Sequence, residues 1–78
     1  MHTKINFTGI FSHYQPINFE PHYVFKSGSD TYLINCKEHP ELISELSPDD
    51  LVNIEAEKGS EVECGTTLVN VKFGRLGV

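Results

Sequence analysis

Apolar and polar residues alternate over several short stretches of the chain, which is typical of half-buried β-strands. The first strand is predicted over residues 4–11, where Ile5, Phe7, Gly9 and Phe11 alternate with polar neighbours. A glycine inside such a strand indicates a bulge or a bend. Residues 12–22 contain Pro16 and Pro21, which cannot donate to a β-ladder, and are therefore predicted to form a long loop or an edge.

A β-hairpin is predicted over residues 23–36. Strand character returns at residues 23–25 and stops at Ser27–Asp30, a turn-forming sequence. In the partner strand, residues 31–36, alternation places Tyr32, Ile34 and Cys36 on one face and Leu33 and Asn35 on the other.

The spacing of apolar residues then changes over residues 39–46, and the new spacing predicts a helix of about two turns. Pro40 suits the first helical turn, and Leu42 and Leu46 are spaced to share one helix face. A turn is predicted at Ser47–Asp50, a strand over 51–57 and a turn at 58–60. The last strand is predicted over 66–73, followed by a tail, residues 74–78, that is expected to fray.

With 78 residues the chain is expected to form one domain, residues 1–78. It contains no apolar run of membrane-spanning length, and its start lacks the pattern of an export signal, so a soluble, cytoplasmic protein is expected. Two cysteines, Cys36 and Cys64, are fewer than small secreted domains usually carry, which favours reduced thiols.

Charge and aromatic residues are distributed unevenly. The net charge is −5, but residues 38–63 alone hold nine acidic residues against Lys58. Seven of the eight aromatic residues precede residue 33. The plain interpretation is that the aromatic side chains form the core and the acidic ones keep a small domain soluble.

The predicted order, with one short helix between the third and fourth of five strands, resembles the OB-fold, a small Greek-key barrel. The most specific part of the resemblance is Leu42–Ile54, which is similar to the helix, turn and entry to the fourth strand of many OB domains. Those domains usually place a glycine where this chain has Asp49. An SH3-like barrel is the alternative; either way the predicted class is all-β with one helix.

The resemblance implies a ligand-binding face across the second and third strands, flanked by the loops after the first and fourth strands. Aromatic rings there would stack on bases, and basic side chains would contact phosphates. The loop over 12–22 supplies His13, Gln15 and His22 as further polar neighbours. The residues of this face are Tyr14, Phe19, Tyr23, Phe25, Lys26, Tyr32 and Lys37.

Two binding functions follow, and both are kept. The principal hypothesis is a protein-interaction module or accessory subunit whose acidic face docks a basic partner, because complementary charge increases association rate and specificity. That face comprises Glu41, Glu45, Asp49, Asp50, Glu55 and Glu57. The alternative is single-stranded nucleic-acid binding by the aromatic face, which the shortage of basic residues weakens. The oligomeric state is left open.

Metal and catalytic chemistry have weaker support in the sequence. Cys36 and His39 form a single ligand pair, whereas structural zinc needs four ligands, so both cysteines are predicted to be small buried strand residues. The sequence has neither a glycine-rich phosphate loop nor a nucleophile elbow. A protein without a cofactor, and without enzymatic activity, is expected.

Overall fold

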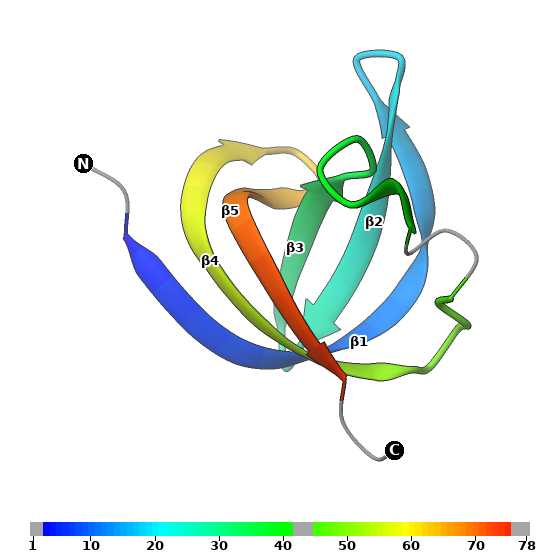
Figure 1. The fold of residues 1–78 in the computed structure, drawn as a ribbon. Helices are drawn as coiled ribbons and strands as arrows, with labels where there is room; N and C mark the ends of the chain where they lie inside the picture. Colours follow the sequence, from blue (N-terminus) through cyan, green and yellow to red (C-terminus); the bar gives the residue numbers. More distant parts are fainter. Residues whose placement is uncertain (1–2, 42–44, 76–78) are drawn as a thin grey trace.

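The computed structural model describes residues 3–41 and 45–75. Five strands account for most of this part of the chain (Figure 1). They are β1 (Lys4–Ile17), β2 (Glu20–Ser27), β3 (Asp30–Asn35), β4 (Leu51–Val62) and β5 (Gly65–Arg75).

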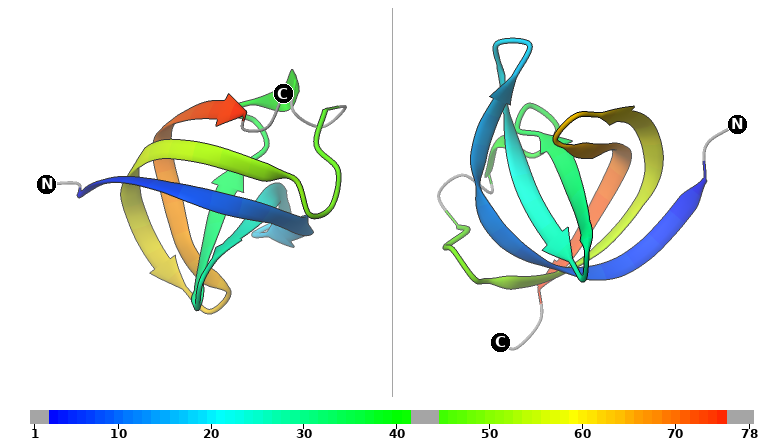
Figure 2. Two further views of the ribbon diagram at one scale, coloured as in Figure 1. Left: turned by 90° about the horizontal axis from the view of Figure 1, so that it is seen from below. Right: turned by 180° about the vertical axis from the view of Figure 1, so that it is seen from behind.

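The five strands close into a barrel in the order β1-β2-β3-β5-β4, and β4 pairs back onto β1 (Figures 1 and 2). The long, curved β1 makes closure possible because it changes partner along its length. Its first half, Lys4–Ile10, pairs with β4 and its second half, Ile10–Ile17, pairs with β2. Only β3 and β5 run parallel. This arrangement is the OB-fold, so the predicted five-stranded OB-like barrel is confirmed and the SH3-like alternative is not adopted.

The barrel interior is filled by alternate residues of all five strands. The buried apolar cluster takes side chains from each strand and from the end of β3, and Tyr32 and Phe73 pack against it. The face predicted for Tyr32, Ile34 and Cys36 is therefore the inner face. The cluster comprises Phe11, Tyr23, Phe25, Ile34, Cys36, Val52, Ile54, Ala56, Leu68 and Val71.

The prediction of a long loop over residues 12–22 is wrong. These residues belong to a β-hairpin that continues β1 and β2 beyond the barrel and turns at Asn18 and Phe19 (Figure 1, top). Pro16 and Pro21 face each other across the ladder. Antiparallel pairs alternate between hydrogen-bonded and non-hydrogen-bonded kinds, and two facing prolines are compatible with the second kind because neither has to donate. The bulge expected near Gly9 lies instead between Phe11 and His13.

The hairpin of β4 and β5 is also longer than predicted. Lys58–Ser60 is not a turn, because β4 continues to Val62 and the chain turns at Glu63 and Cys64. The ladder register shifts between Lys58 and Glu61. At this irregularity Thr67 Oγ1 accepts from Ser60 N at 2.8 Å and lies 3.0 Å from Ser60 O, to which it donates. Residues 74 and 75, predicted to fray, belong to β5, and 76–78 lie outside the described residues.

The connection between β3 and β4 contains only part of the predicted helix. Pro40 and Glu41 form a short 3₁₀ segment, Glu45 lies in a turn, and 42–44 lie outside the described residues, among which no α-helix is found. The turn at Ser47–Asp50 is present, with Asp50 N donating to Ser47 O at 3.0 Å. Asp49 has a φ of 74°, which explains why OB domains favour glycine there and why aspartate is tolerated.

Candidate functional site

The outer face of β1, β2 and β3 carries mostly polar side chains. Strand alternation turns Tyr23 and Phe25 inward, so the residues between and beside them point outward. Across the three strands the outward residues form the rows Gln15–His22–Asn35, His13–Val24–Leu33 and Ile10–Lys26–Thr31. We call these nine residues the outer face.

Alternation also corrects the position of several predicted stacking residues. Tyr23 and Phe25 are completely buried in the barrel, so neither ring is available on an open surface. Tyr32 is half-buried and stacks on Phe7, with ring centroids 4.3 Å apart. The sequence shows which residues share a face, but the outer face also holds apolar residues such as Val24 and Leu33. The assignment of the aromatic face to solvent was wrong for Tyr23 and Phe25.

Tyr14 lies at the rim of the barrel, where the hairpin leaves it. Its side chain is partly exposed, and its ring contacts those of Phe11 and Tyr23, at centroid distances of 5.1 and 5.5 Å. Partial burial raises the pKa of the Tyr14 hydroxyl. Its ring therefore supports the hairpin base more than it offers a free stacking surface.

Phe19 is the predicted aromatic residue that the structure leaves fully accessible. It lies at the tip of the hairpin, which projects beyond the barrel (Figures 1 and 2). Its side chain is completely exposed. Asn18 and Phe19 have φ values of 51° and 68°, as a tight two-residue hairpin turn requires. For a bulky residue this left-handed conformation costs roughly 1–2 kcal/mol, and glycine would avoid the cost. The sequence therefore places a bulky exposed ring at a turn position where glycine would fit without strain.

Both predicted lysines are exposed, Lys26 on the outer face and Lys37 just beyond β3. Lys37 Nζ lies 2.9 Å from Glu20 Oε1, and Asn35 Nδ2 donates to Glu20 Oε2 at 2.9 Å. The hydrogen bond and charge of Lys37, followed by the Asn35 hydrogen bond, lower the pKa of the Glu20 carboxyl, which is ionised at neutral pH. Glu20 and Asn35 are not among the residues predicted from the sequence, because only the strand register brings them to Lys37.

The β4–β5 turn contacts the side of the β1–β2 hairpin at Gln15. Gln15 Nε2 donates to Cys64 Sγ at 2.9 Å, joining the β1–β2 hairpin to the turn between β4 and β5. Val24 and Leu33 are buried although alternation turns them outward from the barrel core. Val24 and Leu33 are therefore not accessible. Ile10, His13 and Lys26 are exposed on the outer face, and Phe19 and Lys37 are exposed beside it, at its rim.

The cysteines correct a further prediction. Cys36 is buried at the end of β3, but Cys64 is exposed in the β4–β5 turn, so the two are not a pair of buried strand residues, and both are free thiols. Burial raises the pKa of the Cys36 thiol. His39 Nε2 contacts Val71 O at 2.7 Å and Nδ1 contacts Glu41 Oε1 at 3.0 Å, which is a bridging role in the chain connection.

The six predicted acidic residues come from three different parts of the fold. Glu41 and Glu45 lie in the connection between β3 and β4, and Asp49 and Asp50 lie in the turn that precedes β4. Asp50 Oδ2 caps that turn by accepting from Ser47 N at 2.9 Å. These four carboxylates therefore belong to a connection and a turn and not to a strand face.

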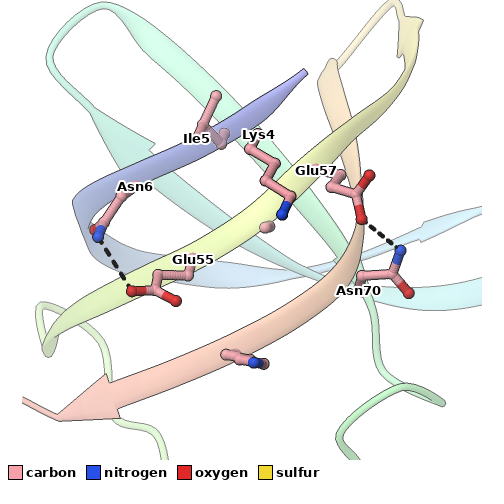
Figure 3. Close-up of a pocket in the computed structure, with 8 residues that line it drawn as sticks. Lys4, Ile5, Asn6, Glu55, Glu57 and Asn70 are labelled. Atoms are coloured by element: carbon pink, nitrogen blue, oxygen red, sulfur yellow. Dashed lines mark hydrogen bonds between the residues drawn. The ribbon is translucent and has the colours of Figure 1, made fainter. Parts of the chain in front are cut away.

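The remaining two acids line a groove of about 480 Å³ over β1, β4 and β5 (Figure 3). Glu55 Oε1 accepts from Asn6 at 3.3 Å and Glu57 Oε2 accepts from Asn70 at 2.7 Å. Lys4 faces Glu57 and Lys72 faces Glu55 in the ladders, so the groove carries both signs of charge. Its charge is therefore balanced and does not select a basic partner.

No family model matches the chain, and no curated protein matches it in sequence. A crystal structure of a mitochondrial single-stranded DNA binding protein from S. cerevisiae is similar in fold, with a TM-score of 0.60. The alignment covers 99% of each chain at 14% sequence identity. A structural similarity at such low sequence identity concerns the fold alone, and it supports the OB-fold over nearly the full chain.

Among residues 3–41 and 45–75, no helix has the length and apolar character needed to cross a membrane.

Proposed function

We propose that the chain binds single-stranded nucleic acid along the rim of the outer face, as a binding protein and not as an enzyme. The observation that carries the proposal is Phe19, a fully exposed ring at the tip of a projecting hairpin. Any base offers a π-face to such a ring, so stacking is a binding mode that tolerates sequence.

Two further observations support this proposal. Lys37 lies at the same end of the molecule as Phe19, beside Glu20 and Asn35. Lys26 adds a second cation on the outer face. The fold is also shared, over nearly the full length of both chains, with a protein described as binding single-stranded DNA. Fold likeness does not transfer function, so the proposal rests on the hairpin tip first.

A basic protein partner receives less support. Its six predicted acidic residues come from a connection, a turn and a groove that also carries Lys4 and Lys72. We therefore carry nucleic-acid binding forward as the single proposed function.

The test is a fluorescence anisotropy titration with labelled single strands of about 15 nucleotides at about 50 mM salt. Phe19→Ala is expected to weaken binding by about 5-fold to 150-fold, because one base–aromatic stack contributes about 1–3 kcal/mol. DNA and RNA strands are compared in parallel.

Leu51→Ala is the matched control, because it also removes an exposed apolar side chain but lies on β4 opposite Ile10, away from the hairpin tip, whose ladder ends at Ile17. Its affinity should equal that of the unmodified protein. No binding of any strand, or equal losses in both variants, would contradict the proposed function.

A further inference from the structure

Glu20 sits between two hydrogen-bond donors at the base of the hairpin tip. Each of its carboxylate oxygens has its own donor, Lys37 Nζ for Oε1 and Asn35 Nδ2 for Oε2, and both distances are 2.9 Å. The side chains of Glu20 and Lys37 are 43% and 73% exposed, so solvent and solutes reach the group.

The side-chain amide of Asn35 makes a second hydrogen bond besides the one to Glu20. Asn35 Oδ1 accepts from Lys37 N at 2.9 Å, which fixes the orientation of the side-chain amide and leaves Nδ2 to point toward Glu20. The same bond ties the backbone of Lys37 to the end of β3. The two donors therefore belong to a preformed arrangement at the strand end, which Glu20 reaches from β2.

We propose that Lys37 Nζ and Asn35 Nδ2 form a binding site for one backbone phosphate of a single strand, and that the Glu20 carboxylate occupies this site in the free protein. This inference rests on the proposed function and adds to it the position of a phosphate contact and a built-in competitor. A phosphate diester presents two unesterified oxygens, which match the two donors that now face the two carboxylate oxygens.

The location fits a strand that stacks on the hairpin tip. Glu20 follows Phe19 directly in the chain and pairs with Ile17 at the first ladder position after the turn. A base on Phe19 would therefore bring its own backbone to the end of the ladder where Lys37 lies. Exposed ion pairs are weak, so an incoming phosphate can displace the carboxylate at small cost.

The first test compares Glu20→Gln with Glu55→Gln in the anisotropy titration. Both variants remove one negative charge, and both glutamates accept a hydrogen bond from an asparagine, but Glu55 lies in the groove over β4 (Figure 3). Glu20→Gln should bind single strands about two- to five-fold more tightly, the range expected for loss of an exposed competing pair. Glu55→Gln should change affinity much less. Equal gains in the two variants, or no gain for Glu20→Gln, would overturn the inference.

The double variant Glu20→Gln/Lys37→Gln tests the identity of the cation. Because the gain depends on a freed Lys37, adding Lys37→Gln should remove it. A gain that persists would mean that Glu20 acts through long-range repulsion and not by occupying the site.

A second measurement separates this inference from the proposed function. The side-chain amide resonances of Asn35 are followed by NMR while inorganic phosphate is added to Glu20→Gln and to Glu55→Gln. A phosphate-dependent shift confined to Glu20→Gln would support the anion site even if no strand bound to any variant, an outcome that defeats the proposed function alone. The same response in both variants, or in neither, would overturn the anion site.

Discussion

Two ionisable side chains, Tyr23 and Cys36, are buried in the same part of the barrel, under the connection that follows β3. The Tyr23 hydroxyl donates to His39 O at 2.6 Å and so anchors that connection. Burial, with the nearby Cys36 thiol as the second cause, raises the pKa of Tyr23 well above its usual range. Both side chains are therefore neutral in the folded protein across the physiological range.

These raised pKa values predict a loss of stability in alkali. Reference pKa values are 9.0 for the thiol and 10.0 for the phenol. Groups with a raised folded pKa contribute fully below the unfolded pKa, and this contribution is lost as pH rises. The free energy of unfolding, measured with urea, should therefore fall from about pH 9 upward.

Cysteine variants test whether the Cys36 thiol causes the first part of the decrease in the free energy of unfolding. Cys36→Ala should shift its onset to the range where tyrosine ionises, whereas Cys64→Ala removes an exposed thiol and should leave the profile unchanged. Identical pH profiles for the two variants would show that the Cys36 thiol is not responsible.

At the scale of elements, the contact between β3 and β5 depends on Gly65. Its φ is 151°, and an added Cβ would collide with the backbone carbonyl of Thr31 at the start of β3. That pairing is parallel and short, joining Tyr32 to Thr66 and Leu33 to Thr67. A side chain at this position would push apart the two strands that close the barrel.

Gly65→Ala is expected to lower the free energy of unfolding by more than about 2 kcal/mol, through the clash and an unfavourable backbone conformation. Gly28→Ala is the matched control, because Gly28 also has a positive φ, 61°, but its added Cβ would meet no atom within 4 Å. It should cost about 1 kcal/mol, for backbone conformation alone. Equal losses in urea unfolding would contradict the role given to the Thr31 contact.

Element boundaries were harder to predict than element order. The proline rule placed a loop at 12–22, since it treats each proline separately, whereas Pro16 and Pro21 share one ladder position. The turn at Asn18 and Phe19 lacks the glycine that normally signals a tight hairpin. The same holds for the candidate site. Phe19 and Lys37 could be predicted from their residue types, but the residues that they lie beside depend on the register of the strands.

At the scale of the whole molecule, the barrel was predictable because five strands with alternating burial must close to remove their edges. Which face of each strand turns inward required the tertiary structure, since Val24 and Leu33 are as buried as Tyr23 and Phe25. The net charge, in contrast, follows directly from the sequence. The number of exposed lysines at the proposed site sets how binding should respond to salt.

The protein has a net charge of −5 and presents two lysines, Lys26 and Lys37, at its proposed site. Its affinity for single strands should therefore depend only weakly on salt concentration. Contact with two phosphates predicts a slope of log affinity against log salt of about −1.4, at about −0.7 per phosphate on a single strand. Anisotropy titrations over a series of salt concentrations measure it, and Lys26→Gln should make the slope shallower by about 0.7. A slope steeper than about −4 would place the strand on a different surface.

The facing prolines of the hairpin also bear on how the protein behaves when concentrated. A two-stranded ribbon that projects into solvent offers backbone donors to any neighbouring chain, which is a route to sheet growth between molecules. Pro16 interrupts that row of donors on one strand and Pro21 interrupts it on the other. The arm can therefore extend far enough to present its tip while resisting aggregation along its sides.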